Sequence, residues 1–200
     1  LSTNLLYLES DIYSPEHVIF ITDIRINDEV AEKLQELYEN GQKICLLDHH
    51  VTNVYLNNYE WASVIPEKHG VKQSATSLFY EFLTFDGAGN PIAEPNSFLE
   101  SYAEAVRKYD TWDWYEENDM LAHDLNMLYF LVSTKVMEDF VIRGSKELEV
   151  FDSIPEEFDL LMEVEKKRIE RFCHSELKTI RWITLFGRKT AVIYLAQSHP

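Results

Sequence analysis

The chain has 200 residues, 46% of them hydrophobic, and a formal net charge of −17, which fits an ordinary folded domain with a strongly acidic surface. Such a surface repels polyanions and argues against long duplex nucleic acid as a partner, but it is compatible with a short phosphorylated substrate because bound metal ions can reverse the local charge. No apolar run approaches the roughly 18 residues of a membrane helix and nothing resembles a signal peptide, so we expect no membrane contact. The two cysteines, Cys45 and Cys173, call for no disulfide framework, which fits a reducing cytoplasm.

The first part of the chain predicts a βαβ unit. Val18–Thr22 is a short β-branched and aromatic run, typical of a buried strand. A helix over about 28–40 follows, with Gly41 as its stop, and Lys43–Leu47 is the next strand. A strand, a helix and a strand within about 30 residues form a right-handed parallel unit in nearly all known proteins.

The rest of the chain is mostly helical in pattern. A long helix begins at Pro155 and extends to about residue 180, and Thr190–Ala196 then resembles a strand. We therefore predict an α/β fold, a parallel sheet flanked by helices, with a long connector helix toward a second α/β domain that is mostly absent. The other expected elements are a short strand at Trp61–Ile65 and helices at about 74–84, 96–109, 118–131 and 135–143.

Two carboxylates directly follow the predicted strands. Asp23 comes after the first strand, and Asp48-His49-His50 comes after the second. Because parallel strands end at the same edge of a sheet, Asp23 and Asp48 should emerge side by side, where open α/β sheets bind ligands. With Asp110, these residues are the types that a hydrolytic two-metal centre needs, and mixed Asp and His ligation suits Mn²⁺, Fe²⁺ or Co²⁺.

Plainer interpretations exist for each residue. Asp23 could cap the helix that follows it, and Asp48 could be a turn residue. Asp110 could be a loop residue at the C-terminal end of a helix, although an acid there is unfavourable unless a positive charge offsets it. For Trp112 and Trp114, packing is favoured over a base-stacking platform.

Four ordered motifs resemble those of one known family, the DHH phosphoesterases, which are named for the triplet at 48–50. The resemblance covers nearly the whole chain, and the segment after Tyr109 is most similar to the oligoribonuclease (nano-RNase B-like) branch. The motifs are Ile21-Thr22-Asp23-Ile24, Leu47-Asp48-His49-His50, Ser74-Ala75-Thr76-Ser77-Leu78-Phe79-Tyr80 and Arg107-Lys108-Tyr109-Asp110-Thr111-Trp112.

The resemblance implies a metal site with two Mn²⁺ ions in the complete protein, with Mg²⁺ or Co²⁺ as alternatives. Asp23 would bridge the two ions, His49 would bind one of them, and Asp110 would complete the same shell.

The resemblance also implies catalytic and substrate-binding residues. His50 would face the scissile phosphate as a hydrogen-bond donor or general acid, and Asp48 would orient a histidine through its ring N–H. Ser74 and Thr76 would support the substrate from a helix N-terminus, whose free N–H groups favour an anion.

Two parts of the family pattern are missing from this chain. No Asp-x-Asp motif precedes Asp23, since residues 1–16 contain only Asp11, and the Gly-Gly-Gly-His type motif of the C-terminal substrate-binding domain is absent. We therefore expect a fragment with half a metal site and very weak or no activity by itself. The expected division is 1–154 catalytic domain, incomplete at its N-terminus, 155–184 connector helix, and 185–200 start of the substrate-binding domain.

The expected function is that of a divalent-metal-dependent phosphodiesterase that hydrolyses short oligoribonucleotides or small nucleotides to 5′-monophosphates. One alternative is a phosphatase for a nucleotide such as adenosine bisphosphate, or a pyrophosphatase, of the same fold. A second alternative is an inactive nucleotide-binding regulatory module. The sequence leaves open whether the molecule forms a homodimer.

Overall fold

The structure is a computed structural model that describes residues 17–193. The chain divides into two compact units, Leu1–Ser153 and Ile154–Pro200. The first unit contains the sheet and most of the helices. The second contains one long helix and a β-hairpin, and it is described separately below.

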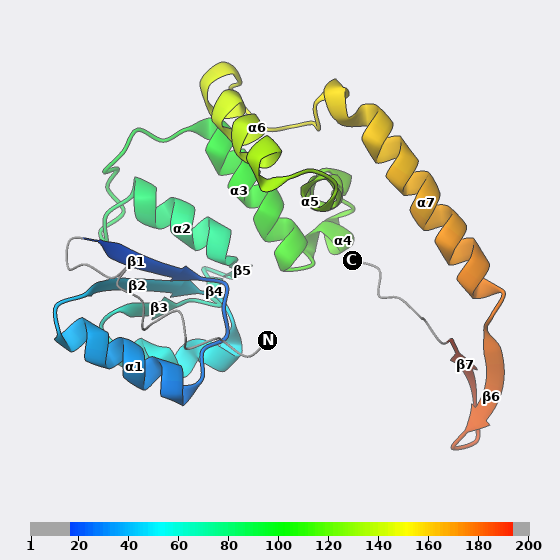
Figure 1. Cartoon of the computed structure of the whole chain (residues 1–200), viewed down its shortest axis with the longest axis horizontal. Coiled ribbons are helices and arrows are strands. Elements are labelled where there is room, and N and C mark those ends of the chain that lie inside the picture. The colour runs from blue at the N-terminus through cyan, green and yellow to red at the C-terminus, as the bar shows by residue number, and fades with distance from the viewer. Residues whose placement is uncertain (1–16, 194–200) are drawn as a thin grey trace. The chain divides into compact units, whose positions relative to one another are not determined.

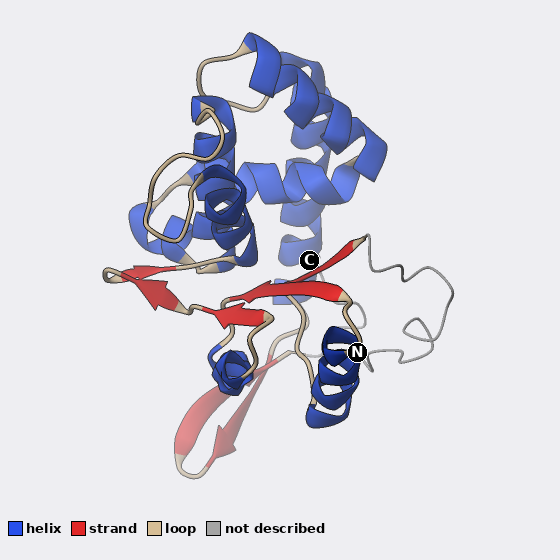
Figure 2. Cartoon of the chain, turned by 90° about the vertical axis from the view of Figure 1, so that its left-hand side faces the viewer, coloured by secondary structure: helices blue, strands red, loops and turns tan. Residues whose placement is uncertain are grey.

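The first unit is built on a parallel sheet in the order β1-β2-β3 (Figure 1). Its strands are β1 (Val18–Thr22), β2 (Lys43–Asp48) and β3 (Ala62–Val64), and both neighbouring pairs are parallel. Helix α1 (Asp28–Glu39) and helix α2 (Ala75–Thr84) lie on opposite faces of the sheet. The second view shows the strands as a layer with helices on both sides (Figure 2). The predicted α/β fold and the βαβ unit are therefore confirmed.

Helix α1 begins and ends as its sequence predicts. The side chain of Asn27 accepts a hydrogen bond of 2.9 Å from the backbone N–H of Val30, so Asn27 and not Asp23 caps the helix. Gly41 has a φ of +91°, the left-handed conformation that commonly ends a helix. The helix buries its apolar face against β2, β3 and the 3₁₀ segment η2 (Val51–Asn58). This core consists of Ile26, Val30, Ala31, Leu34, Ile44, Leu46, Leu56, Trp61 and Val64.

A group of helices follows α2, and the predicted helices are all present. They are α3 (Ser97–Asp110), α5 (Met120–Leu131) and α6 (Thr134–Glu147), together with α4 (Asp113–Glu117), which was not predicted because five residues show no helical period. The ring of Phe98 on α3 is fully buried and meets Phe140 and Phe151 edge to face. Helix α3 also contacts α2 and α5, so it joins the helical group to the sheet.

The first unit also contains a second, smaller sheet. The short strands β4 (Glu67–Lys68) and β5 (Val71–Lys72) form a small antiparallel hairpin between β3 and α2. Among the described residues, no helix is both long enough and apolar enough to cross a membrane.

The second unit differs from its prediction in the end of its helix and in its strands. After the 3₁₀ turn η3 (Glu156–Phe158), helix α7 (Asp159–Leu177) ends before residue 180, and β6 (Arg181–Leu185) pairs with β7 (Arg188–Val192) in an antiparallel hairpin. Strand β6 occupies part of the range assigned to the connector helix, and β7 starts two residues before Thr190. The aromatic and β-branched residues of β6 and the left-handed Phe186 and Gly187 explain this hairpin. The predicted strand residues 194–196 and Gln197–His199 lie outside the described residues.

Candidate metal centre

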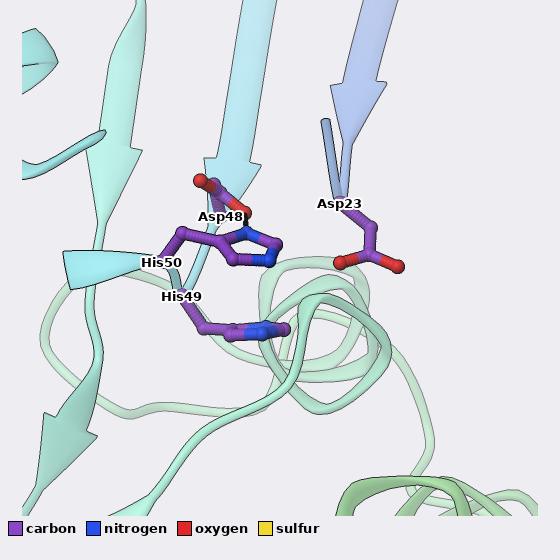
Figure 3. A group of neighbouring side chains, drawn as sticks. All are labelled: Asp23, Asp48, His49 and His50. Atoms are coloured by element: carbon purple, nitrogen blue, oxygen red, sulfur yellow. Dashed lines mark hydrogen bonds and ion pairs between the residues drawn. The ribbon is translucent and has the colours of Figure 1, made fainter. Parts of the chain in front are cut away.

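The register of β1 and β2 places two carboxylates at one edge of the sheet. Thr22 pairs with Leu47, so the next residues, Asp23 and Asp48, leave the ends of neighbouring strands. Asp23 is exposed and has a φ of +57°, which a short polar residue tolerates better than a bulky one. This turn directs its carboxylate toward the residues that follow β2 (Figure 3).

Four of the predicted side chains converge at this edge. One ligand atom from each of Asp23, Asp48, His49 and His50 lies within 4.8 Å of the corresponding atom of the other three (Figure 3). The two imidazole rings are stacked, with centroids 4.4 Å apart. Asp110, the last residue of α3, joins the group because its Oδ2 lies 3.5 Å from His49 Nε2. All five predicted residues therefore meet.

Asp48 is fully buried and is held by two partners. Its Oδ1 lies 2.8 Å from His50 Nδ1, and Asn53 donates a hydrogen bond from its amide to Oδ2. The same amide of Asn53 donates to the carbonyl of Ile24, 3.1 Å away, and so ties η2 to the turn after β1. Asp48 is thus the end of a strand and not a turn residue. No motif in the sequence singles out Asn53, because an asparagine in such a segment resembles an ordinary loop residue.

The carboxylates and their burial shift the pKa values of His50 and Asp110. Burial opposes a charge on His50, but the hydrogen bond and charge of Asp48, with the charges of Asp23 and Asp110, outweigh burial and raise the pKa of the imidazole. Burial raises the pKa of Asp110, and the negative charge of Asp23 adds to this effect, although His49 opposes it. Several acids so close together repel one another, and a bound cation would relieve that repulsion.

The donor atoms fit a divalent cation. Among residues 17–193, nothing hydrogen-bonds to His49 Nδ1, although this nitrogen is buried. A buried polar atom normally has a partner, so this orphaned nitrogen is unusual. The other ring nitrogen of His49, Nε2, lies 3.5 Å from Asp110 Oδ2, and a cation could bind between these two atoms. Carboxylate oxygens together with imidazole nitrogens are ligands for Mn²⁺, Fe²⁺, Co²⁺ and Zn²⁺, in contrast to the thiolates of structural zinc sites.

A cavity of about 440 Å³ opens beside these residues. Its wall includes Asp23 and Asp110, and Thr76 in the first turn of α2 also lines it. Ser74 does not line it: its buried hydroxyl accepts from the N–H of Ser77 and caps α2. The remaining lining residues, which the sequence did not single out, are Ala75, Tyr102, Val106, Tyr109, Ala122, Leu125, Asn126 and Tyr129.

Comparison with known proteins gives one relative of named activity. The chain is 36% identical over 160 residues to oligoribonuclease NrnB of Bacillus subtilis (strain 168). The matched region is 78% of this chain and 38% of NrnB. The chain therefore spans well under half the length of this relative. No family model matches. The chain is also similar to the crystal structure of an uncharacterized protein from Helicobacter pylori G27, with 28% sequence identity and a TM-score of 0.38. The matched region is 54% of this chain and 30% of the Helicobacter pylori chain. The NrnB relative supports a relationship to the oligoribonucleases that the motifs resemble.

Proposed function

We propose that this chain carries the catalytic residues of a DHH-family phosphodiesterase that hydrolyses short oligoribonucleotides or small nucleotides to 5′-monophosphates in the cytoplasm. The observation that carries this proposal is the convergence of Asp23, Asp48, His49 and His50 within 4.8 Å at the carboxyl edge of a parallel sheet. The similarity to an oligoribonuclease selects phosphodiester hydrolysis among the reactions that such a site can support.

We assign the metal ligands to the residues that the sequence predicted. Asp23, His49 and Asp110 would hold divalent cations, with Mn²⁺ as the expected ion because the donors mix oxygen and nitrogen. Cations bound there would lower the pKa of water and neutralise charge on the phosphoryl oxygens during an in-line displacement. The cavity beside Asp23 and Asp110 is where the substrate would lie.

His50 has the right environment for proton transfer. Its Nδ1 is occupied by the hydrogen bond to Asp48, so the other ring nitrogen, Nε2, is left for the substrate. The buried carboxylate of Asp48 would support a protonated ring, which could donate from Nε2 to a phosphoryl oxygen and then give its proton to the leaving oxygen. Asp48 would act only through His50.

The other predicted partners belong to the same proposal. The net charge of −17 would keep long duplex nucleic acid away, so the substrates would be short RNA or small nucleotides. The second unit would link these residues to a substrate-binding domain, and a homodimer is compatible with this arrangement.

The direct test is hydrolysis of a diribonucleotide by the full-length protein with Mn²⁺. Asp23→Asn and His49→Ala should abolish release of nucleoside 5′-monophosphates while circular dichroism shows that each variant is folded. Asp139→Asn, which changes an exposed carboxylate on α6, is the matched control and should retain full activity.

Each other outcome has a defined meaning. Unchanged turnover in Asp23→Asn or His49→Ala would refute the assignment of the ligands. If the protein releases inorganic phosphate from a nucleotide such as adenosine bisphosphate but forms no monophosphates from a dinucleotide, the phosphatase alternative is favoured. Binding of nucleotide with no turnover under any divalent cation would favour the inactive regulatory module.

A further inference from the structure

An exposed tryptophan in a strained backbone conformation follows the candidate metal centre. Trp112 has a φ of +65°, a left-handed conformation that is a rare outlier for a bulky side chain. Its side chain is 67% exposed, so burial of the indole does not explain the conformation. Strained residues of this kind persist where the surrounding structure holds them, and they cluster at ligand sites.

Trp112 is the outer member of a stack of three aromatic rings. Tyr109 and Trp114 are nearly parallel, with centroids 5.8 Å apart and an interplanar angle of 11°. The rings of Trp112 and Trp114 are also stacked, with centroids 6.2 Å apart and an interplanar angle of 30°. The stack thus begins at Tyr109, which lines the cavity next to Asp110, and ends at a ring that is mostly exposed.

Charged side chains on both sides hold this segment in place. The buried guanidinium of Arg107 donates to Asp113 Oδ2 over 2.7 Å. Lys72 donates to the other oxygen of Asp113 over 3.0 Å and to the carbonyl of Thr111 over 3.2 Å. These contacts fix the backbone on both sides of Trp112, and its ring stacks on Trp114, so fewer ring positions are open before a ligand arrives and the entropy cost of binding is lower.

Packing explains Trp114 but not Trp112. Trp114 is half-buried between Tyr109 on one side and Trp112 on the other, and His123 also meets it at 4.9 Å. The sequence preference for packing therefore suits Trp114. Trp112 instead has two thirds of its surface exposed at the end of a ring stack, which is a geometry that can accept one more flat ring.

We propose that the exposed face of Trp112 is a stacking subsite for a nucleobase of the substrate. This inference rests on the proposed phosphodiesterase function. Trp112 is two residues after Asp110, so their Cα atoms are at most roughly 7 Å apart, and a base attached near the reacting phosphate would reach the indole. On a protein with a net charge of −17, contacts with the uncharged bases add affinity without the repulsion that the phosphates meet. Every base has a π face, so this subsite would tolerate any sequence.

The test compares two substrates in the full-length protein. For a diribonucleotide, Trp112→Ala should raise KM about five- to tenfold with kcat nearly unchanged, because stacking on an aromatic side chain contributes to base binding. For the same dinucleotide with one base removed, at the 5′ position or the 3′ position in separate substrates, one of the two should be cleaved equally well by wild type and variant. Trp112→Phe should restore most of the affinity.

Tyr115→Ala is the matched control. Tyr115 is 72% exposed and touches the edge of Trp114, but it is not part of the parallel stack, so its removal should leave KM unchanged. An unaltered KM in Trp112→Ala overturns the subsite. So does an equal loss on the intact and both base-depleted substrates, which indicates a structural role. A changed oligomeric state in Trp112→Ala, measured by sedimentation, also overturns it and shows that Trp112 contacts another protein chain.

Binding separates this inference from the proposed function. Fluorescence anisotropy of a labelled dinucleotide should show weaker binding to Trp112→Ala than to wild type, with or without turnover. If wild type binds the dinucleotide through Trp112 but does not cleave it with any divalent cation, the proposed hydrolysis fails and the subsite stands. If hydrolysis occurs and binding is equal in both proteins, the subsite fails alone.

Discussion

Asp48 Oδ1 lies 2.8 Å from His50 Nδ1, and the carboxylate of Asp48 is fully buried. This contact restrains the imidazole ring and places a proton on Nδ1, so Nε2 is the ring nitrogen that remains for other partners. The other oxygen of Asp48 accepts from Asn53, so the carboxylate itself cannot rotate freely. A buried acid that holds a histidine in this way affects chemistry only through the histidine.

Asp48→Asn should therefore lower kcat by about 10- to 100-fold, the usual effect of losing a residue that orients a ligand or catalytic group. Burial lowers the pKa of His50, and the hydrogen bond and charge of Asp48 are the first factors that raise it. The substitution should thus shift the pKa of His50 downward in the metal-free protein, which an NMR titration of the imidazole measures. Asp139→Asn is the control, and an unchanged His50 titration in Asp48→Asn would contradict the assigned role.

The βαβ unit could be predicted from the sequence because its signals are local. Val18–Thr22 and Lys43–Leu47 are short apolar runs with turn residues between helix and strand, and both became parallel strands. The rule that parallel strands end at one edge then placed Asp23 beside Asp48. That step required no knowledge of distant contacts.

Contacts between distant segments were harder to predict. No spacing in the sequence indicates that Asp110 would approach His49 to 3.5 Å, and the resemblance to a family supplied that prediction. The role of Asn53 depends on the path of η2 beneath the turn after β1, which composition does not reveal. The exposure of Trp112 was not predicted because an indole usually packs in a core, and here a left-handed backbone turns it outward.

Metal binding should stabilise the fold. If Mn²⁺ binds the native state alone, a free concentration one hundred times the Kd raises the free energy of unfolding by about 2.7 kcal/mol. Urea unfolding with Mn²⁺ and then with excess chelator measures this gain and its reversal. His49→Ala should lose most of the gain, whereas His69→Ala, in the β4–β5 turn, should retain it. An equal gain in both variants would mean that the ion binds elsewhere.

Asp110→Asn should have opposite effects on stability with and without metal. Burial and the charge of Asp23 raise the pKa of Asp110, so its ionised form is unfavourable in the metal-free fold. A neutral amide removes that repulsion, and the metal-free variant should unfold at a higher urea concentration than wild type. With Mn²⁺ the order should reverse because a ligand is lost. A variant that is less stable than wild type in both conditions would show that Asp110 is structural.

The close approach of α6 to α3 depends on Gly144. A Cβ at this position would overlap the ring of Phe98, which is fully buried and cannot move aside. Gly144→Ala should therefore lower the free energy of unfolding by about 1–3 kcal/mol, although alanine is the better helix former. Gly87→Ala is the control, since nothing lies within 4 Å of its added methyl group. A Gly144→Ala protein as stable as wild type would show that the helices can separate without loss.

Asp119 holds the end of α3 to the start of α5, near Tyr109 and Asp110. Its Oδ1 accepts from the N–H groups of Leu121 and Ala122, and its Oδ2 accepts from Lys108 over 2.9 Å. Asp119→Ala loses the helix cap and the ion pair and should cost roughly 1–2 kcal/mol. Asp119→Asn keeps the cap and loses only the charge, so it should cost less, about 0.5–1 kcal/mol.

The cost of Asp119→Asn should also depend on pH. The hydrogen bond from Lys108 lowers the pKa of Asp119 below its unfolded value of about 3.9. A lowered carboxyl pKa stabilises the fold above the unfolded pKa, and this stabilisation is lost as the pH falls through the folded pKa. The difference between wild type and Asp119→Asn in urea unfolding should therefore be constant near pH 7 and shrink toward zero below the pKa. A difference that persists unchanged in acid would show that the amide disturbs the cap itself and that the charge of Asp119 contributes nothing.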